Sequence, residues 1–85
     1  MRILHILRKA PDEWTKEAIK SHNQSMDVTV LLIQEGVLIE ERLPGRLVLA
    51  LDEDVKKRNL SIDLPRIDYA SMVRLLFEND RVICW

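Results

Sequence analysis

Residues 28–33 read VTVLLI, and this short stretch decides the fold class. The run has the length of one strand and does not alternate between apolar and polar side chains. Such runs are typical of strands covered on both faces, as in parallel sheets packed between helices. The segments ILHIL at 3–7 and RLVLAL at 46–51 have the same character. Together the three segments predict the interior strands of an α/β sheet.

A helix is predicted between the first two strands. Pro11 followed by two acidic residues is a typical helix opening, and the polar stretch SHNQS at 21–25 ends the segment. On a helix, Trp14, Ala18 and Ile19 share one face, which we expect to pack on the sheet.

The chain between the second and third strands is less regular. QEG at 34–36 breaks the strand, VLIEERL at 37–43 is long enough for one or two helical turns, and LPGR at 43–46 predicts a turn. A short helix is expected from about 52 to 58, with acids in its first turn and bases in its last. Asn59 is placed to end that helix in the left-handed conformation.

The C-terminal part contains a weakly indicated fourth strand within 60–68, then a helix and a last short strand, RVICW at 81–85. Asp68 is well placed to cap the helix. The apolar residues of the helix recur at i, i+3, i+4, i+7 and i+8, and they are Tyr69, Met72, Val73, Leu76 and Phe77.

The alternation of strand and helix predicts one small flavodoxin-like α/β domain over residues 1–85. We expect a mainly parallel sheet of about five strands, flanked on both faces by short helices because parallel crossovers are right-handed. Four short helices are thin cover for such a sheet. Some apolar surface is therefore expected to meet another subunit.

Composition excludes several classes of protein. The chain has 85 residues, 13 basic and 14 acidic, and a formal net charge of −1. The densest basic cluster, KKR at 56–58, is explained by a helix dipole, so direct nucleic-acid binding is not favoured. No apolar run is long enough to span a membrane, and no signal peptide is recognisable, which predicts a cytoplasmic protein.

The sequence offers no cofactor or metal site. The loop RKAPDEW at 8–14 contains no glycine and so cannot form a phosphate cradle. His5 and His22 have no partner at metal-ligand spacing, and His5 is best explained as a satisfied structural histidine. The carboxylates of DED at 52–54 are best explained as a helix start.

Cys84 is the single cysteine, so an internal disulfide is excluded. Reactive thiols need access and a nearby cation or helix N-terminus. Cys84 instead lies in a strand-like segment between Ile83 and Trp85, which favours a buried packing role. Its position near the end of the chain keeps a catalytic role open, because chain ends fray and expose their residues.

Several segments in order resemble the DsrE/DsrF/DsrH-like sulfur-relay proteins, and among them the DsrH/TusB type. They are LHILRKAP at 4–11, VLLIQEGV at 30–37, LDEDVKKRNL at 51–60 and IDYASMVRL at 67–75, followed ten residues later by Trp85. No single segment is diagnostic, but their order and spacing in so short a chain make the resemblance fairly specific.

The resemblance implies a flavodoxin-like domain in a cytoplasmic complex with TusC/DsrF-like and TusD/DsrE-like subunits. Such complexes pass persulfide sulfur towards 2-thiouridine at the tRNA wobble position, or serve sulfur oxidation. In them the sulfur-carrying cysteine belongs chiefly to the TusD/DsrE-like subunit. Some DsrH-type members also carry a cysteine in the first helix, where this chain has EAIK at 17–20. Asn59 and Glu35 replace a usual glycine and aspartate.

The main hypothesis is therefore a subunit of a sulfurtransferase complex that is not catalytic on its own and binds no cofactor. The candidate partner-contacting residues are Gln34, Glu35, Gly36, Val37, Asp68 and Tyr69. Two alternatives stay open. Cys84 would act as a persulfide carrier in the first, and the chain would form a stand-alone homo-oligomeric interaction module in the second.

Overall fold

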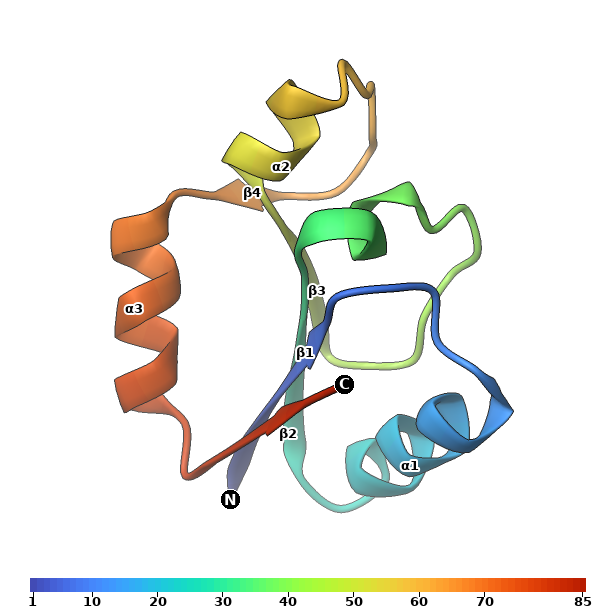
Figure 1. The fold of residues 1–85 in the computed structure, drawn as a ribbon. Helices are drawn as coiled ribbons and strands as arrows, with labels where there is room; N and C mark the ends of the chain where they lie inside the picture. The colour runs from blue at the N-terminus through green and yellow to red at the C-terminus, as the bar shows by residue number, and fades with distance from the viewer.

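The computed structural model describes residues 1–85 as five strands and four short helices (Figure 1). The strands are β1 (Arg2–Leu7), β2 (Asp27–Leu32), β3 (Leu47–Leu51), β4 (Arg66–Ile67) and β5 (Arg81–Cys84). The helices are α1 (Glu13–Asn23), the 3₁₀ helix η1 (Gln34–Leu38), α2 (Asp52–Lys57) and α3 (Tyr69–Glu78).

All five strands join one sheet in the order β4-β3-β2-β1-β5, and every neighbouring pair is parallel. The predicted fold class is confirmed: the domain is a small, flavodoxin-like α/β domain with a parallel sheet. β1 is flanked by β2 and by the last strand, so that His5 lies opposite Val30 on one side and Ile83 on the other.

Helices cover both faces of the sheet (Figure 1). α1, η1 and α2 pack on one face, and α3 alone lies on the other. β1, β2, β3 and β4 follow one another across the sheet, whereas the chain must return past β1 to form β5. Because parallel crossovers are right-handed, this reversal of direction puts α3 on the opposite face from α1.

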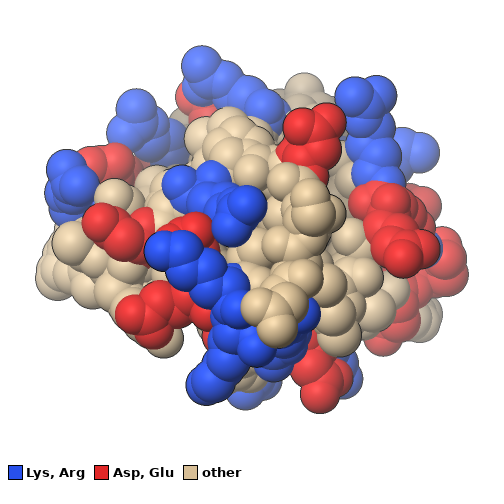
Figure 2. All heavy atoms as spheres, turned by 90° about the horizontal axis from the view of Figure 1, so that it is seen from above, with Lys and Arg blue, Asp and Glu red and all other residues tan.

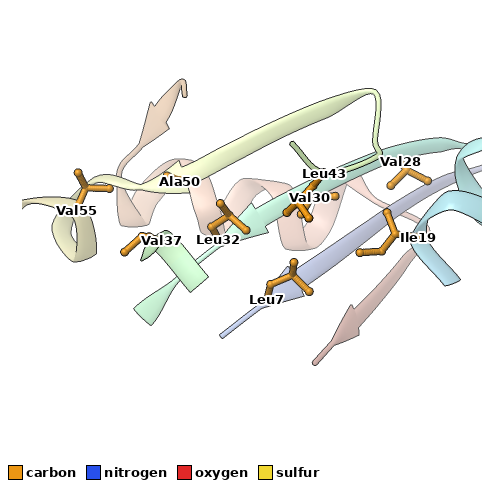
Figure 3. Close-up of a cluster of buried hydrophobic side chains, with 9 residues drawn as sticks. All are labelled: Leu7, Ile19, Val28, Val30, Leu32, Val37, Leu43, Ala50 and Val55. Atoms are coloured by element: carbon orange, nitrogen blue, oxygen red, sulfur yellow. The ribbon is translucent and has the colours of Figure 1, made fainter. Parts of the chain in front are cut away.

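The two faces of β2 explain its continuous apolar run. Val28, Val30 and Leu32 point into the larger cluster on the α1 side, which Figure 3 shows. That cluster has nine members: Leu7, Ile19, Val28, Val30, Leu32, Val37, Leu43, Ala50 and Val55. Leu31 points the other way, into a smaller cluster with Leu4, Ile6 and Leu49 under α3. A strand buried on both faces has no polar side, as its sequence predicted.

Two local predictions were wrong. Helical turns were expected within 37–43, but the chain forms η1 at Gln34–Leu38 instead. Trp14 was expected on the packed face of α1, yet it is 86% exposed, while Thr15 and Ile19 are buried. Asp12 accepts hydrogen bonds from the backbone N–H and the hydroxyl of Thr15, both at 2.9 Å. This cap turns Thr15 inward and leaves Trp14 outside.

α3 also uses its apolar residues differently from the simple amphipathic pattern. Met72 and Leu75 pack against the sheet, and no residue of the helix is fully buried. Val73 is 45% exposed, Leu76 38% and Phe77 85%. No helix of the protein is both long enough and apolar enough to cross a membrane.

Candidate functional site

The carboxyl ends of parallel strands share one edge of the sheet, and open α/β sheets bind ligands and partners there. The segment QEGV at 34–37 follows β2, Asp68 follows β4, and Trp85 follows β5. Figure 2 looks down on the end of the molecule where α2 lies. Acidic and basic side chains are interspersed around an uncharged centre there, without the one-sided basic face expected of a nucleic-acid grip.

The QEGV segment forms the first turns of η1. Gln34 has a φ of 52° and is exposed, as is Glu35, whereas Gly36 and Val37 are buried. The backbone N–H of Gln34 donates a 2.8 Å hydrogen bond to Oδ2 of Asp54 on α2. This contact holds a backbone conformation that non-glycine residues rarely adopt.

Gly36 is required by close packing. A Cβ atom at this position would lie 2.3 Å from the carbonyl oxygen of Leu7, a backbone atom at the end of β1. Only a residue without a side chain lets η1 approach β1 this closely. Gln34 and Glu35 are consequently the members of the segment that offer side chains to a partner.

Asp54 was not among the candidate residues, although it organises this edge. Its side chain is largely buried and holds Gln34 through Oδ2, while Oδ1 lies 3.6 Å from the Arg58 guanidinium one turn later. The DED motif gave the signal, but its acids were interpreted together as a helix start. Asp52 does lie in the first turn of α2, as that interpretation expects, and its carboxylate pairs with Lys56 at 2.9 Å.

Asp68 is the N-cap of α3, as predicted. Its Oδ1 accepts a 2.8 Å hydrogen bond from the backbone N–H of Ser71. That bond is the main reason why the pKa of the Asp68 carboxyl lies below its usual value. Tyr69 begins the helix and is 48% exposed.

The structure does not bring the two predicted groups together. The QEGV segment packs with α2 on the α1 side of the sheet, whereas Asp68 and Tyr69 belong to the helix on the opposite side. β3 separates β2 from β4 in the sheet. Each group therefore belongs to a separate surface at the same end of the molecule.

Cys84 is exposed, so the expectation of a buried packing cysteine was wrong. β5 is an edge strand, and Cys84 lies opposite Ile6, on the face that α3 covers only in part. Val82, on the same face of the strand, is 41% exposed. The sequence showed an apolar run but not that its strand would be at the edge. No group of three or more His, Cys, Asp or Glu side chains is placed to hold a metal ion.

A chain of three aromatic rings lies on the other face of the same strand pair. Nε1 of Trp85 donates to Nδ1 of His5 at 2.9 Å, and Nε2 of His5 lies 3.0 Å from Nδ1 of His22 on α1. The ring centroid of His5 lies 5.2 Å from that of His22 and 6.0 Å from that of Trp85, and both ring pairs are stacked. His5 is thus a buried, satisfied histidine, as expected.

Hydrogen-bond chemistry determines which nitrogen atoms of these three rings carry protons. An indole nitrogen is only a donor, so Nδ1 of His5 must be the acceptor. A neutral His5 then carries its proton on Nε2 and donates it to His22. Burial, followed by the neighbouring His22, lowers the pKa of His5 to about 4, so this ring is neutral at physiological pH. Sequence reasoning treated the two histidines separately and missed both partners.

Several hollows mark the surface of the domain. One of about 150 Å³ lies beside the ring chain and is lined by Lys9, Ala10, Pro11, Asp12, Thr15 and Trp85. A larger one of about 380 Å³ lies among the first residues of β1, β2 and β3 and the end of α3, away from the carboxyl edge. Its lining mixes arginines with carboxylates and so favours neither sign of charge.

Comparison with known proteins identifies the fold. No protein-family model matches the chain, and no curated protein is significantly similar to it in sequence. Among solved structures, the chain is similar to the ychN protein from E. coli, with a TM-score of 0.69 over 100% of both chains and a sequence identity of 15%. At that identity the similarity establishes a shared fold over the whole length of the two proteins.

Proposed function

We propose that this chain is an accessory subunit of a cytoplasmic sulfur-relay complex. In this proposal it assembles with TusC/DsrF-like and TusD/DsrE-like subunits and holds no cofactor. The complex would serve 2-thiolation of the tRNA wobble uridine or sulfur oxidation. Two lines support the proposal: the ordered segments that resemble the DsrH/TusB type, and the small α/β fold that this resemblance implies and that the chain shares with ychN.

The observation that carries the accessory role is the exposed apolar face of α3. Tyr69, Val73, Leu76 and Phe77 lie on successive turns of one helix, and Phe77 is 85% exposed. Contiguous apolar surface of this kind marks protein interfaces, in which aromatic side chains carry much of the binding energy. A partner subunit that covers α3 would also complete the thinly covered face of the sheet.

Co-purification tests the proposal. We expect the chain to elute with co-expressed TusC-like and TusD-like partners in one size-exclusion peak. The Phe77→Ser variant should elute separately from the partners. The matched control is Trp14→Ser, since Trp14 is equally exposed, at 86%, but lies on α1 on the opposite face. Loss of the complex in both variants, or in neither, would contradict an interface at α3.

A second candidate function is favoured by the exposure of Cys84. In this alternative a donor persulfide transfers its outer sulfur to the Cys84 thiolate. The sulfur–sulfur bond of the donor breaks, a new one forms on Cys84, and the donor leaves as a thiolate. The reaction needs an accessible thiol, which the edge position provides.

Native mass spectrometry separates the two functions. The chain and a TusD-like partner are incubated with a cysteine desulfurase and cysteine, and each chain is weighed. Added sulfur on this chain that disappears in Cys84→Ser supports the carrier function. Added sulfur on the partner alone, with both chains in one complex, supports the accessory role. A third outcome, in which the chain forms a homo-oligomer and binds neither partner, would favour a stand-alone interaction module.

A further inference from the structure

β5 is held on the domain by its backbone pairing with β1 and, at its end, by the side chain of Trp85. The exposed Val82 and Cys84 contribute little burial, whereas Trp85 packs against the main core cluster. Its backbone N–H donates to the carbonyl of Ile6 at 2.9 Å. Its indole N–H donates to His5, which makes the ring chain a connection between α1 and the last strand.

The three hydrogen-bonded rings of His22, His5 and Trp85, called the ring chain here, can keep both hydrogen bonds in only one protonation state. Its two hydrogen bonds contain two protons, one from the indole of Trp85 and one on Nε2 of His5. A further proton on Nδ1 of His22 would point at the proton on Nε2 of His5. A further proton on Nδ1 of His5 would point at the indole N–H of Trp85. In either case two protons face each other and one hydrogen bond is lost. No arrangement of tautomers removes the conflict, because the indole nitrogen cannot accept and a histidine ring keeps at least one proton.

The bond to Trp85 is the one that is lost. A protonated His22 can donate from Nδ1 to Nε2 of His5, and this bond is charge-assisted, hence roughly twice as strong as a neutral one. His5 must then carry its own proton on Nδ1, which faces the indole N–H of Trp85. The stronger bond is kept at the expense of the weaker.

We propose that His5, His22 and Trp85 form a proton-sensitive latch, which holds the end of β5 when neutral and releases Trp85 when the histidine pair takes up one proton. Release loosens the strand that presents Cys84. The latch follows from the geometry of the three rings and is independent of the proposed sulfur-relay function.

Charged groups lie near the three rings, but the ring contacts of His5 and His22 are only with each other and with Trp85. Arg8 donates to the backbone oxygen of Trp85 at 3.2 Å, and Lys9 and Asp12 line the hollow beside the indole. Lys20 shares the last turn of α1 with His22, and Arg81 begins β5. Only burial and His22 itself shift the pKa of His5, which falls to about 4. The ring of His22 is partly exposed, so solvent reaches this member of the pair directly.

Hydrogen exchange of the two indole N–H groups, followed by NMR as the pH is lowered from about 7.5 to about 5, tests the latch. Trp14 is the internal reference, because it is 86% exposed and its indole has the same intrinsic pH dependence. We expect exchange at Trp85 relative to Trp14 to rise about fivefold to tenfold on acidification, as for the loss of one neutral hydrogen bond.

Imidazole nitrogen shifts provide a second measurement on the unmodified protein: the proton of His5 is expected to move from Nε2 to Nδ1 as His22 is protonated. In the control His22→Gln, the amide oxygen accepts from His5 but does not titrate, so the exchange ratio should stay constant. A constant ratio in the wild type, a His5 proton that stays on Nε2, or the same titration in His22→Gln would each overturn the latch.

Discussion

The buried ring of His5 should make the fold sensitive to mild acid. The pKa of this ring is lowered from 6.5 to about 4, first by burial and then by His22. Between pH 6.5 and about pH 4, the His5 ring is largely protonated in the unfolded chain but neutral in the native protein. The stabilising effect of the neutral ring is therefore complete above about pH 6.5 and is lost as the pH falls to about 4.

The size of the effect follows from the shift. At about 1.4 kcal/mol per pKa unit, the lowering of the His5 pKa corresponds to about 3 kcal/mol of unfolding free energy. A domain of this kind has only about 5–15 kcal/mol in total. Acidification to pH 4 should thus remove a large part of its stability.

Urea denaturation followed by circular dichroism, at intervals from pH 7.5 to 4, measures the loss. The reference is His5→Gln, whose amide can accept from Trp85 and donate to His22 without titrating. The wild type should lose about 3 kcal/mol more than this variant over that range. Carboxyls with lowered pKa values, such as Asp12 and Asp68, are common to both proteins and cancel in the difference. An excess loss below about 1 kcal/mol would refute the argument.

Three further predictions concern the carboxyl edge. Gly36→Ala should lower the unfolding free energy by about 1–3 kcal/mol in urea, because the new Cβ meets the backbone oxygen of Leu7; an unchanged value would show that η1 can move away. Asp54→Ala should lower the unfolding free energy by about 1–3 kcal/mol, because the N–H of Gln34 loses its charged acceptor. Asp54→Asn should lower it by less, and equal losses in the two variants would contradict this role. Cys84 should react with Ellman's reagent in the native protein within about tenfold of its rate in urea, whereas labelling only after unfolding would refute its exposure.

Local signals predicted the elements of this fold well. The unbroken apolar run of β2 indicated burial on both faces, and both core clusters do draw on that strand. Asp68 caps α3, and Asn59 adopts a φ of 51° after α2, as their side chains favour. These features depend on neighbours within a few residues, so one short segment contains the information.

Features set by distant neighbours were missed. Cys84 was expected to be buried because its segment is apolar, but exposure depends on β5 being an edge strand that α3 covers in part. Trp14 is an exception, because its exposure follows from the nearby cap at Asp12, which the apolar pattern of the helix did not reveal. The contact of His5 with His22 joins a strand to a helix across 17 residues, and no spacing rule encodes it.

The place of β5 beside β1 has a consequence for biosynthesis. β1 can pair with β2 once residue 32 has left the ribosome, but its other edge has no partner until residues 81–84 follow. During that interval the nascent domain presents a six-residue strand, five of whose side chains are buried in the finished fold. Bare apolar edges recruit other chains, so the growing polypeptide is most prone to aggregate before its last strand is made. The addition of β5 replaces that edge with a shorter strand that begins with Arg81.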